Sequence, residues 1–267
     1  MISLAVTGAT GRMGSRISAL SMEYDGLKLS GALEHEGLAC IGKDLGHVIG
    51  IGETGVIISS SADEVISASD VTIDFTSVQA TLDNVEVAVL NSKAMVIGTT
   101  GLKKEDIAKI EKAAKKIPVV MSPNMSVGIN LLLKVLMQIS PILAEEYDIE
   151  IIEAHHRFKK DAPSGTALKL AQVIADSIKR DLDEVAVYCR KGITGERTNS
   201  EIGIQTIRAG DIVGDHTVMF GGLGERIEIT HKASSRDTFA RGALRAALWV
   251  ANKNSGLYDM QDVLGLK

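Results

Sequence analysis

The sequence predicts an α/β protein of two domains, the first built on a parallel sheet and the second an α+β domain with a mixed sheet. In the first half of the chain, short β-branched runs alternate with helical patterns, which is typical of βαβ units. Two of these runs, residues 71–75 and 94–97, are almost continuously apolar, as strands buried on both faces are. After Asn130 several β-like runs follow one another through turn-rich connections, which favours a different architecture there.

The first domain should contain six strands and at least three helices. The strands are β-branched or apolar runs that end at polar or glycine residues, and the helices fill the intervals between them. We expect strands at 2–7, 27–33, 56–58, 71–75, 94–97 and 118–121, and helices at 12–23, 78–90 and 103–116. This order predicts a parallel sheet covered by helices on both faces.

The second domain should begin with a long apolar helix at 131–144. A strand at 149–154, a helix at 165–179 and strands at 202–208, 216–220 and 226–232 should follow. The connections AGDIVGD and GGLG contain no helical interval, so we expect hairpins in an antiparallel or mixed sheet. A final helix is expected at 238–251, with Ser234, Ser235 or Asp237 as its cap.

Composition excludes several classes of function. The chain has 267 residues, of which 45% are hydrophobic, which is enough for a buried core. A net charge of -5 indicates neither nucleic acid nor a membrane surface as a partner. No apolar run approaches the roughly 18 residues needed to span a bilayer, and the N-terminus lacks signal-peptide features, so we expect a cytoplasmic protein. Cys40 and Cys189 form no CxxC pair, which indicates neither a disulfide framework nor a cysteine metal site.

A glycine-rich turn, GATGRMG at residues 8–14, follows the first strand and opens the first helix. Glycines let backbone amides approach a pyrophosphate, and the helix start adds free N–H groups and a partial positive charge. The spacing is GxxGxxG and not GxGxxG, so a tight turn in an unrelated α/β protein remains an alternative. The candidate cofactor contacts in this turn are Gly8, Ala9, Thr10, Gly11, Arg12 and Met13.

Other candidate cofactor contacts lie at the carboxyl ends of later strands, where ligands bind in open α/β sheets. Glu34 closes the second strand, where a carboxylate can accept hydrogen bonds from ribose hydroxyls, although a solvated acid is also common there. The segments GTTG and SPNM offer small side chains and open backbone that can face a nicotinamide and its ribose, although GTTG can also be an ordinary turn. They contribute Gly98, Thr99, Thr100, Ser122, Pro123, Asn124 and Met125.

The segment EAHHRFKKDAPSGT at 153–166 is expected to be a loop between a strand and a helix, and it crowds histidines and cations together. His155 can donate a proton at neutral pH, and Lys159 can donate one or fix a carboxylate. The helix start, with the Ser164 and Thr166 hydroxyls, can bind a carboxylate. His155 and His156 should face opposite ways if the strand persists through both.

Two other interpretations of this loop stay open. Arg157 and Lys160 can simply be solvated or paired with Glu153 and Asp161. The side chains of Glu153, His155, His156 and Asp161 are also competent metal ligands, but no HExxH helix or cysteine pair accompanies them, so we expect no metal.

Three segments in this order, GATGRMG, SPNMSVGIN and HHRFKKDAPSGTA, resemble the dihydrodipicolinate reductase family, now called 4-hydroxy-tetrahydrodipicolinate reductase. The last follows the family pattern HHxxKxDAPSGTA at every specified position. The resemblance implies a Rossmann-like dinucleotide-binding domain of residues 1–126 and 237–267, with the last helix packed back on it. Residues 127–236 would form the substrate-binding and tetramerisation domain.

The resemblance also implies roles for residues. The family reduces the cyclic imine 4-hydroxy-tetrahydrodipicolinate to tetrahydrodipicolinate with NADH or NADPH, in the diaminopimelate route to lysine. His155 would be the proton donor and Lys159 a second donor or acceptor, with His156, Gly165 and Thr166 at the substrate carboxylate. His35 stands where the family has a basic residue that meets the NADP phosphate, which leaves the NADH or NADPH preference open, although Arg12 is also in reach of a 2′-phosphate. A homotetramer built through the second domain's sheet is implied as well.

This function has two rivals. The first is another dehydrogenase that acts on an amino-acid semialdehyde or an α-amino acid; it would share the glycine turn but lack the 153–166 loop. The second is a sensor that binds a nicotinamide nucleotide and a dicarboxylate without turnover. A sensor has no need of a proton donor such as His155.

Overall fold

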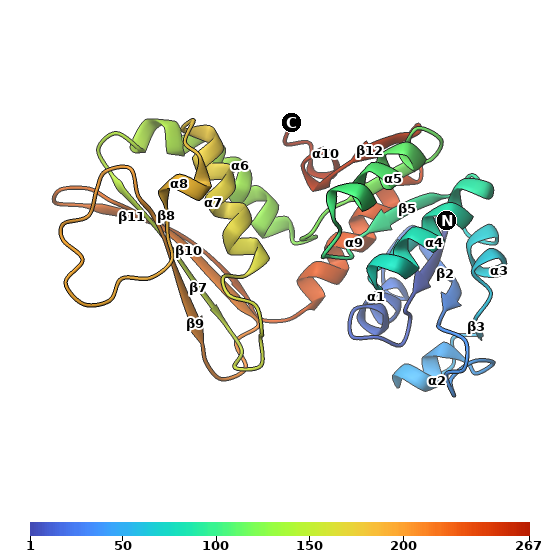
Figure 1. Cartoon of the computed structure of the whole chain (residues 1–267). Helices are drawn as coiled ribbons and strands as arrows, with labels where there is room; N and C mark the ends of the chain where they lie inside the picture. Colours follow the sequence, from blue (N-terminus) through green and yellow to red (C-terminus); the bar gives the residue numbers. More distant parts are fainter. The chain divides into compact units, whose positions relative to one another are not determined.

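A computed structural model describes every residue from Met1 to Lys267 and divides the chain into two compact units. The first unit comprises Met1–Val127 and Arg236–Lys267, and the second comprises Gly128–Ser235. Each unit has its own sheet (Figure 1). Each unit also has its own buried hydrophobic residues. None of the helices is long and apolar enough to cross a lipid bilayer.

The sheet of the first unit has seven strands in the order β12-β6-β5-β4-β1-β2-β3, and all paired neighbours are parallel. Strand β1 pairs with β2 on one side and with β4 on the other, so the strand order reverses at β1. Ligands bind at such a switch point, outside the carboxyl ends of the strands. The strands are β1 Ile2–Thr7, β2 Leu27–Leu33, β3 Ile58–Ser59, β4 Val71–Asp74, β5 Ala94–Ile97, β6 Pro118–Met121 and β12 Gly256–Tyr258.

Helices cover both faces of this sheet. On one face, Leu4 and Val6 of β1 share a core with α1 and α9, and on the other face a second core joins β5 to α3, α4 and α5. The last long helix, α9, therefore belongs to the first unit. The helices of this unit are α1 Gly14–Ser21, α2 Leu45–Ile49, α3 Ala62–Ser67, α4 Val78–Leu90, α5 Lys104–Ala114, α9 Asp237–Val250 and α10 Met260–Leu264.

The second unit holds a mixed sheet of five strands in the order β11-β10-β7-β9-β8. Its central strand β7 runs antiparallel to β10 and parallel to β9. Burial alternates along β7 and β10, because one face of the sheet packs against α6 and α7 and the other face does not (Figure 1). The elements are α6 Val127–Leu143, β7 Asp148–His155, α7 Gly165–Ser177, α8 Leu182–Val185, β8 Ala186–Val187, β9 Ile202–Arg208, β10 Gly214–Gly221 and β11 Arg226–Ala233.

The predicted fold class is confirmed, and five strands have the expected bounds. Two details were wrong. The runs at 202–208 and 216–220 do not form a hairpin, because both flank β7, where Ile151 has an apolar partner on each side. The last helix has no side-chain cap, and Asp237 instead forms an ion pair with Arg16 at 2.7 Å. The short elements α2, α3, α8, α10, β8 and β12 were missed.

Candidate active site

The glycine turn lies at the carboxyl end of β1, and the structure explains its spacing. Gly8 has a φ of 60°, in the left-handed region that glycine adopts readily. A Cβ on Gly14 would lie 2.0 Å from the carbonyl oxygen of Gly8, so the start of α1 presses directly on the turn. No side chain caps α1. Backbone N–H groups at the turn and the helix start can therefore donate hydrogen bonds to an anion such as a pyrophosphate.

Glu34 is held against this turn. Its Oε1 accepts hydrogen bonds from Thr10 N at 2.7 Å and from Thr10 Oγ1 at 2.6 Å. Its other carboxylate oxygen has no hydrogen bond within the chain, so it can accept one from a ribose hydroxyl. His35, the next residue, is exposed, and its Nδ1 lies 2.6 Å from the carbonyl oxygen of Glu36.

Asp74, which the sequence did not single out, ties together three segments of the same edge. The side chain is fully buried at the end of β4. Its carboxylate accepts hydrogen bonds from Thr81 Oγ1 at 2.8 Å and Asn84 Nδ2 at 2.8 Å, both on α4. It also accepts from Thr76 Oγ1 at 2.8 Å and Thr99 Oγ1 at 3.0 Å. One carboxylate thus fixes the loop after β4, the start of α4 and the GTTG segment.

Phe75 and Thr76 join the segments further. A Cβ on Gly98 would lie 2.2 Å from the ring of Phe75, so the ring covers the bare backbone of Gly98. Thr76 N donates to Thr99 Oγ1 at 3.0 Å, and the Thr76 methyl group is 3.0 Å from a Cβ built on Gly8. The structure therefore places Phe75 and Thr76 between two predicted cofactor segments.

The SPNM segment lies next to GTTG, because Ser122 N donates to the carbonyl oxygen of Ile97 at 3.1 Å. Ser122 Oγ donates to the carbonyl oxygen of Asn124 at 2.8 Å, which shapes the turn. Pro123 and Thr100 are exposed, whereas Ala9 and Met125 lie in the hydrophobic core. All the predicted cofactor segments thus lie along one edge of the sheet. Ala9 and Met125 are buried at this edge. Arg12, in the glycine turn, is exposed.

In the second unit, His155 is the last residue of β7 and is 9% exposed. Its Nδ1 lies 2.6 Å from Glu153 Oε2, while its Nε2 makes no hydrogen bond within the chain. A Cβ on Gly214 of the neighbouring strand would lie 3.0 Å from this Nε2. The glycine therefore leaves the free nitrogen uncovered.

Glu153 is fully buried and ionised. Burial alone would raise its pKa, but hydrogen bonds from Arg208, His155 and the Ser164 N–H lower the pKa of Glu153 to about 2. For His155 the balance is reversed: burial lowers its pKa, and the hydrogen bond to Glu153 opposes this only in part. The sequence left open whether Arg157 or Lys160 pairs with Glu153; the partner is Arg208, at 2.8 Å, from β9.

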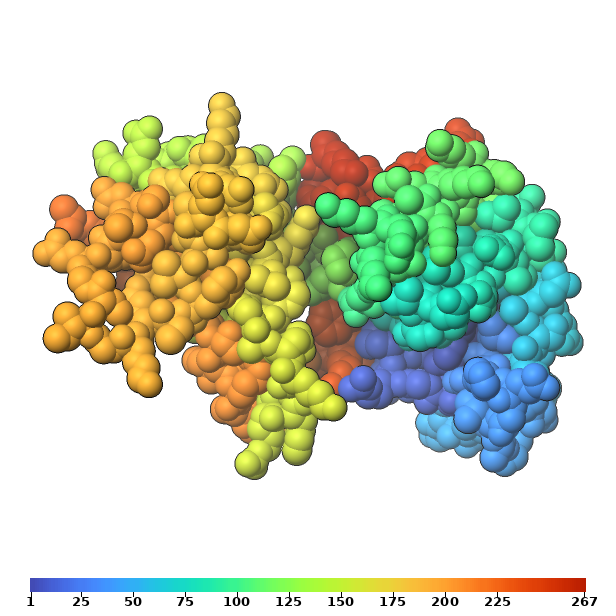
Figure 2. All heavy atoms as spheres, in the orientation of Figure 1, coloured from blue at the N-terminus to red at the C-terminus, as the bar shows by residue number.

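The loop after His155 protrudes from the surface of the second unit (Figures 1 and 2). Lys159 Nζ lies 2.9 Å from Asp161, and this hydrogen bond lowers the pKa of the Asp161 carboxyl. His156 follows the end of the strand and is half-buried, and its Nδ1 has no hydrogen-bond partner. Phe158 is exposed.

Helix α7 begins at Gly165, as predicted, and Ser164 is its N-cap. Ser164 Oγ accepts from Ala167 N at 3.2 Å and lies 3.1 Å from His216 Nε2, so this buried hydroxyl is already engaged within the chain. Gly165 is exposed, with open space around the position of a Cβ. A carboxylate can therefore approach the helix start at Gly165 and Thr166.

His216 lies next to His155, and the sequence did not single it out. Its ring centroid is 5.2 Å from that of His155, with an interplanar angle of 77°. Burial lowers the pKa of His216 to about 4, so it is neutral at neutral pH. Nowhere in the chain do three or more His, Cys, Asp or Glu side chains gather in an arrangement that could hold a metal ion.

Comparisons with known proteins identify relatives of both units of the chain. Residues 2–125 match the family model for the N-terminus of dihydrodipicolinate reductase, and residues 128–264 match the model for its C-terminus. The chain is 55% identical to the 4-hydroxy-tetrahydrodipicolinate reductase of Syntrophobacter fumaroxidans and 54% identical to that of Syntrophotalea carbinolica. Both alignments cover 100% of both chains.

A solved structure shares the fold of the whole chain. It is a dipicolinate-bound dihydrodipicolinate reductase from Paenisporosarcina sp. TG-14, with a TM-score of 0.77 and 24% identity over 98% of each chain. The match of both family models and the full-length identity lead to one conclusion. The chain belongs to the dihydrodipicolinate reductase family.

Proposed function

We propose that the protein reduces 4-hydroxy-tetrahydrodipicolinate to tetrahydrodipicolinate with NADH or NADPH, in the diaminopimelate route to lysine. The observation that carries this proposal is the uncovered Nε2 of His155 in a chain that is 55% identical over its full length to a curated reductase of this name. The direct test is nucleotide oxidation with the aldol product of pyruvate and aspartate semialdehyde. Turnover of a simple amino acid, with none of the cyclic imine, would contradict it.

The first unit would hold the nucleotide. The amides of residues 12–14, which have no hydrogen-bond partner within the chain, would bind the pyrophosphate, Glu34 would accept hydrogen bonds from ribose hydroxyls, and segments 98–100 and 122–125 would line the nicotinamide. The bound nicotinamide supplies a hydride. Phe75 and the Asp74 hydrogen bonds hold the GTTG segment in place, so the protein bears little cost of ordering it when the nucleotide binds.

The second unit would hold the substrate and move the proton. His155 in its protonated form would donate through Nε2, the nitrogen without a partner, and Lys159 would act as a second donor or acceptor. The two substrate carboxylates would be bound by His156, by the start of α7 at Gly165 and Thr166, and by the cap region at Ser164.

The protein would act in the cytoplasm, where free thiols such as those of Cys40 and Cys189 stay reduced.

We also propose that the protein is a homotetramer assembled through the second unit's sheet. The outer face of β10 and β11 carries Thr217, Met219 and Thr230, with no helix over it, and β11 is an edge strand. Open edges and uncovered faces favour association with another chain. Sedimentation velocity should give a mass four times 28.4 kDa. Met219→Lys, which places a charge on this face, should lower that mass. Gln172→Lys, at a half-buried position on α7, should not. A monomeric wild-type protein would overturn this proposal.

Replacing His155 with glutamine should lower kcat by about 10²–10⁴, because a general acid is lost. Nucleotide affinity, measured by fluorescence titration, should stay unchanged. In the wild-type protein kcat should fall as pH rises through the pKa of His155, since only the protonated form donates, and burial places that pKa below the ordinary histidine value. Unaltered turnover in the variant would remove His155 from the mechanism and would revive the sensor hypothesis.

Replacing Gly214 with alanine should lower kcat by about 10–100-fold, because a methyl group 3.0 Å from His155 Nε2 displaces the ring or blocks its approach to substrate. Gly221→Ala is the matched control, since it lies on the same strand and a Cβ there meets nothing within 4 Å. Steady-state kinetics at saturating nucleotide would measure both. Equal activity in the two variants would show that Nε2 is not the working atom.

Replacing His35 with arginine should raise kcat/KM for NADPH by about tenfold, because a guanidinium forms charge-assisted hydrogen bonds with a 2′-phosphate. The value for NADH should change little. His35→Gln is the control for removal of the imidazole and should leave the ratio of the two nucleotides near that of the wild type. If His35→Arg leaves this ratio unchanged, residue 35 does not contact the phosphate.

A further inference from the structure

We propose that Glu153 is the positioning residue of this site. It keeps the proton of neutral His155 on Nδ1, fixes the direction of the ring, and leaves Nε2 as the atom that exchanges a proton with the substrate. The proton transfer rests on the function proposed above. The hold of Glu153 on His155 rests on the contacts of these two residues alone.

The carboxylate of Glu153 is fully buried, and both of its oxygens are occupied. Oε2 lies 2.6 Å from His155 Nδ1 and accepts from Arg208 Nη1 at 2.8 Å. Oε1 accepts from Arg208 Nη2 at 2.9 Å, from Ser164 N at 3.0 Å and from Thr206 Oγ1 at 3.2 Å. Five donor atoms from four residues on three segments therefore fix the carboxylate in one orientation.

This arrangement dictates the tautomer of His155. An ionised carboxylate only accepts hydrogen bonds, so the Nδ1 that faces it must carry a hydrogen. In the neutral ring the free electron pair is then on Nε2, and protonation of the ring adds its second proton there. Gly214 has no side chain that could cover Nε2. The proton that His155 exchanges is therefore on the accessible side of the ring.

The same carboxylate couples His155 to the start of α7. Glu153 accepts the N–H of Ser164, the cap residue of that helix, and Arg208 Nη2 also donates to the carbonyl oxygen of Asp161 at 2.7 Å. The proton donor and the proposed carboxylate site are thus set in place by one buried ion pair. Partners that orient metal-bound histidines typically change affinity or activity 10–100-fold when they are mutated, and we expect an effect of the same size for Glu153.

The charges around His155 give a second consequence. The titratable and charged groups that act on it are Glu153 on its own strand, Lys159 in the loop, Arg208 on β9 and His216 on β10. Glu153 is the negative member of this set. Loss of its charge should therefore make protonation of His155 harder and move the alkaline limb of the kcat profile to lower pH.

The test uses the full-length protein labelled with ¹⁵N-histidine, with His155 assigned by its absence in His155→Gln. Long-range ¹H–¹⁵N spectra report the tautomer directly and without turnover. Neutral His155 in the wild type should carry its hydrogen on Nδ1. In Glu153→Gln the new amide can donate to Nδ1, so part or all of the population should shift to Nε2–H, and kcat should fall by about 10–100-fold with nucleotide affinity unchanged.

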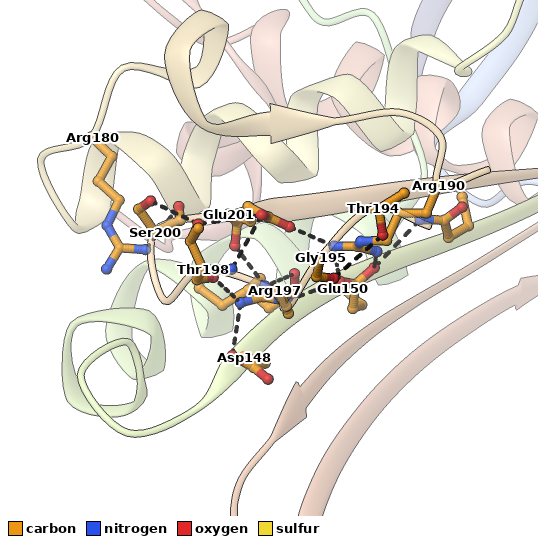
Figure 3. Close-up of polar contacts among 12 residues, drawn as sticks. Asp148, Glu150, Arg180, Arg190, Thr194, Gly195, Arg197, Thr198, Ser200 and Glu201 are labelled. Atoms are coloured by element: carbon orange, nitrogen blue, oxygen red, sulfur yellow. Dashed lines mark hydrogen bonds and ion pairs between the residues drawn. The ribbon is translucent and has the colours of Figure 1, made fainter. Parts of the chain in front are cut away.

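Glu150→Gln is the matched control. Glu150 lies on the same strand but on the opposite face, and it also pairs with arginines: Arg190 Nη2 at 2.8 Å and Arg197 Nε at 3.3 Å. Figure 3 shows this separate network, with Arg197 also reaching Asp148. Loss of this carboxylate should leave the tautomer of His155 and the pH profile of kcat unchanged.

Two results would overturn the proposal. One is a wild-type His155 that carries its hydrogen on Nε2, which can be measured even if Glu153→Gln does not fold. The other is the same shift of tautomer and pH profile in Glu150→Gln as in Glu153→Gln. The proposed reaction fails separately: if His155→Gln retains full turnover while the tautomer is as expected, Glu153 still orients the ring, but the ring is not the proton donor.

Discussion

The buried ion pair between Glu153 and Arg208 is the interaction on which the second unit depends. A carboxylate without solvent must have its charge compensated and its oxygens hydrogen-bonded, or it becomes strongly destabilising. Here Arg208 from β9 supplies the charge, and His155, Ser164 and Thr206 supply further donors. A requirement of burial therefore also aligns a histidine, a helix start and two neighbouring strands.

The first unit also buries a carboxyl group, but no cation pairs with it. Asp74 is also fully buried, and its partners are hydroxyl and amide groups from Thr76, Thr81, Asn84 and Thr99. Each of these groups comes from a segment that borders the carboxyl edge of the sheet. In both units, a buried carboxyl group at or near a strand end organises loops that would otherwise need to be ordered by the ligand.

Much of the fold and of the candidate site could be predicted from the sequence, because local sequence signals are strong in the segments that form the site. The glycine turn, the GTTG and SPNM segments, and the start of α7 at Gly165 all follow from turn chemistry and helix-start signals. Other site residues depend on which strands are neighbours. Arg208 reaches Glu153 because β9 runs parallel beside β7, and Gly214 faces His155 because β10 lies on the other side. Neither pairing follows from periodicity, and Phe75 and Thr76 were missed for the same reason: they matter because β4 lies next to β1.

The return of the chain to the first unit has a consequence for biosynthesis. The core on one face of its sheet includes Leu244 and Val250 of α9 and Met260 of α10, and β12 forms its edge strand. The first 127 residues therefore leave the ribosome with α1 but without α9, the longer helix on this face. The second unit is continuous in sequence, from Gly128 to Ser235, and can complete its own core earlier. In nascent chains of this protein, the second unit should thus complete its fold before the first unit does. The apolar face of the first unit's sheet stays exposed until the C-terminal helices have been synthesised.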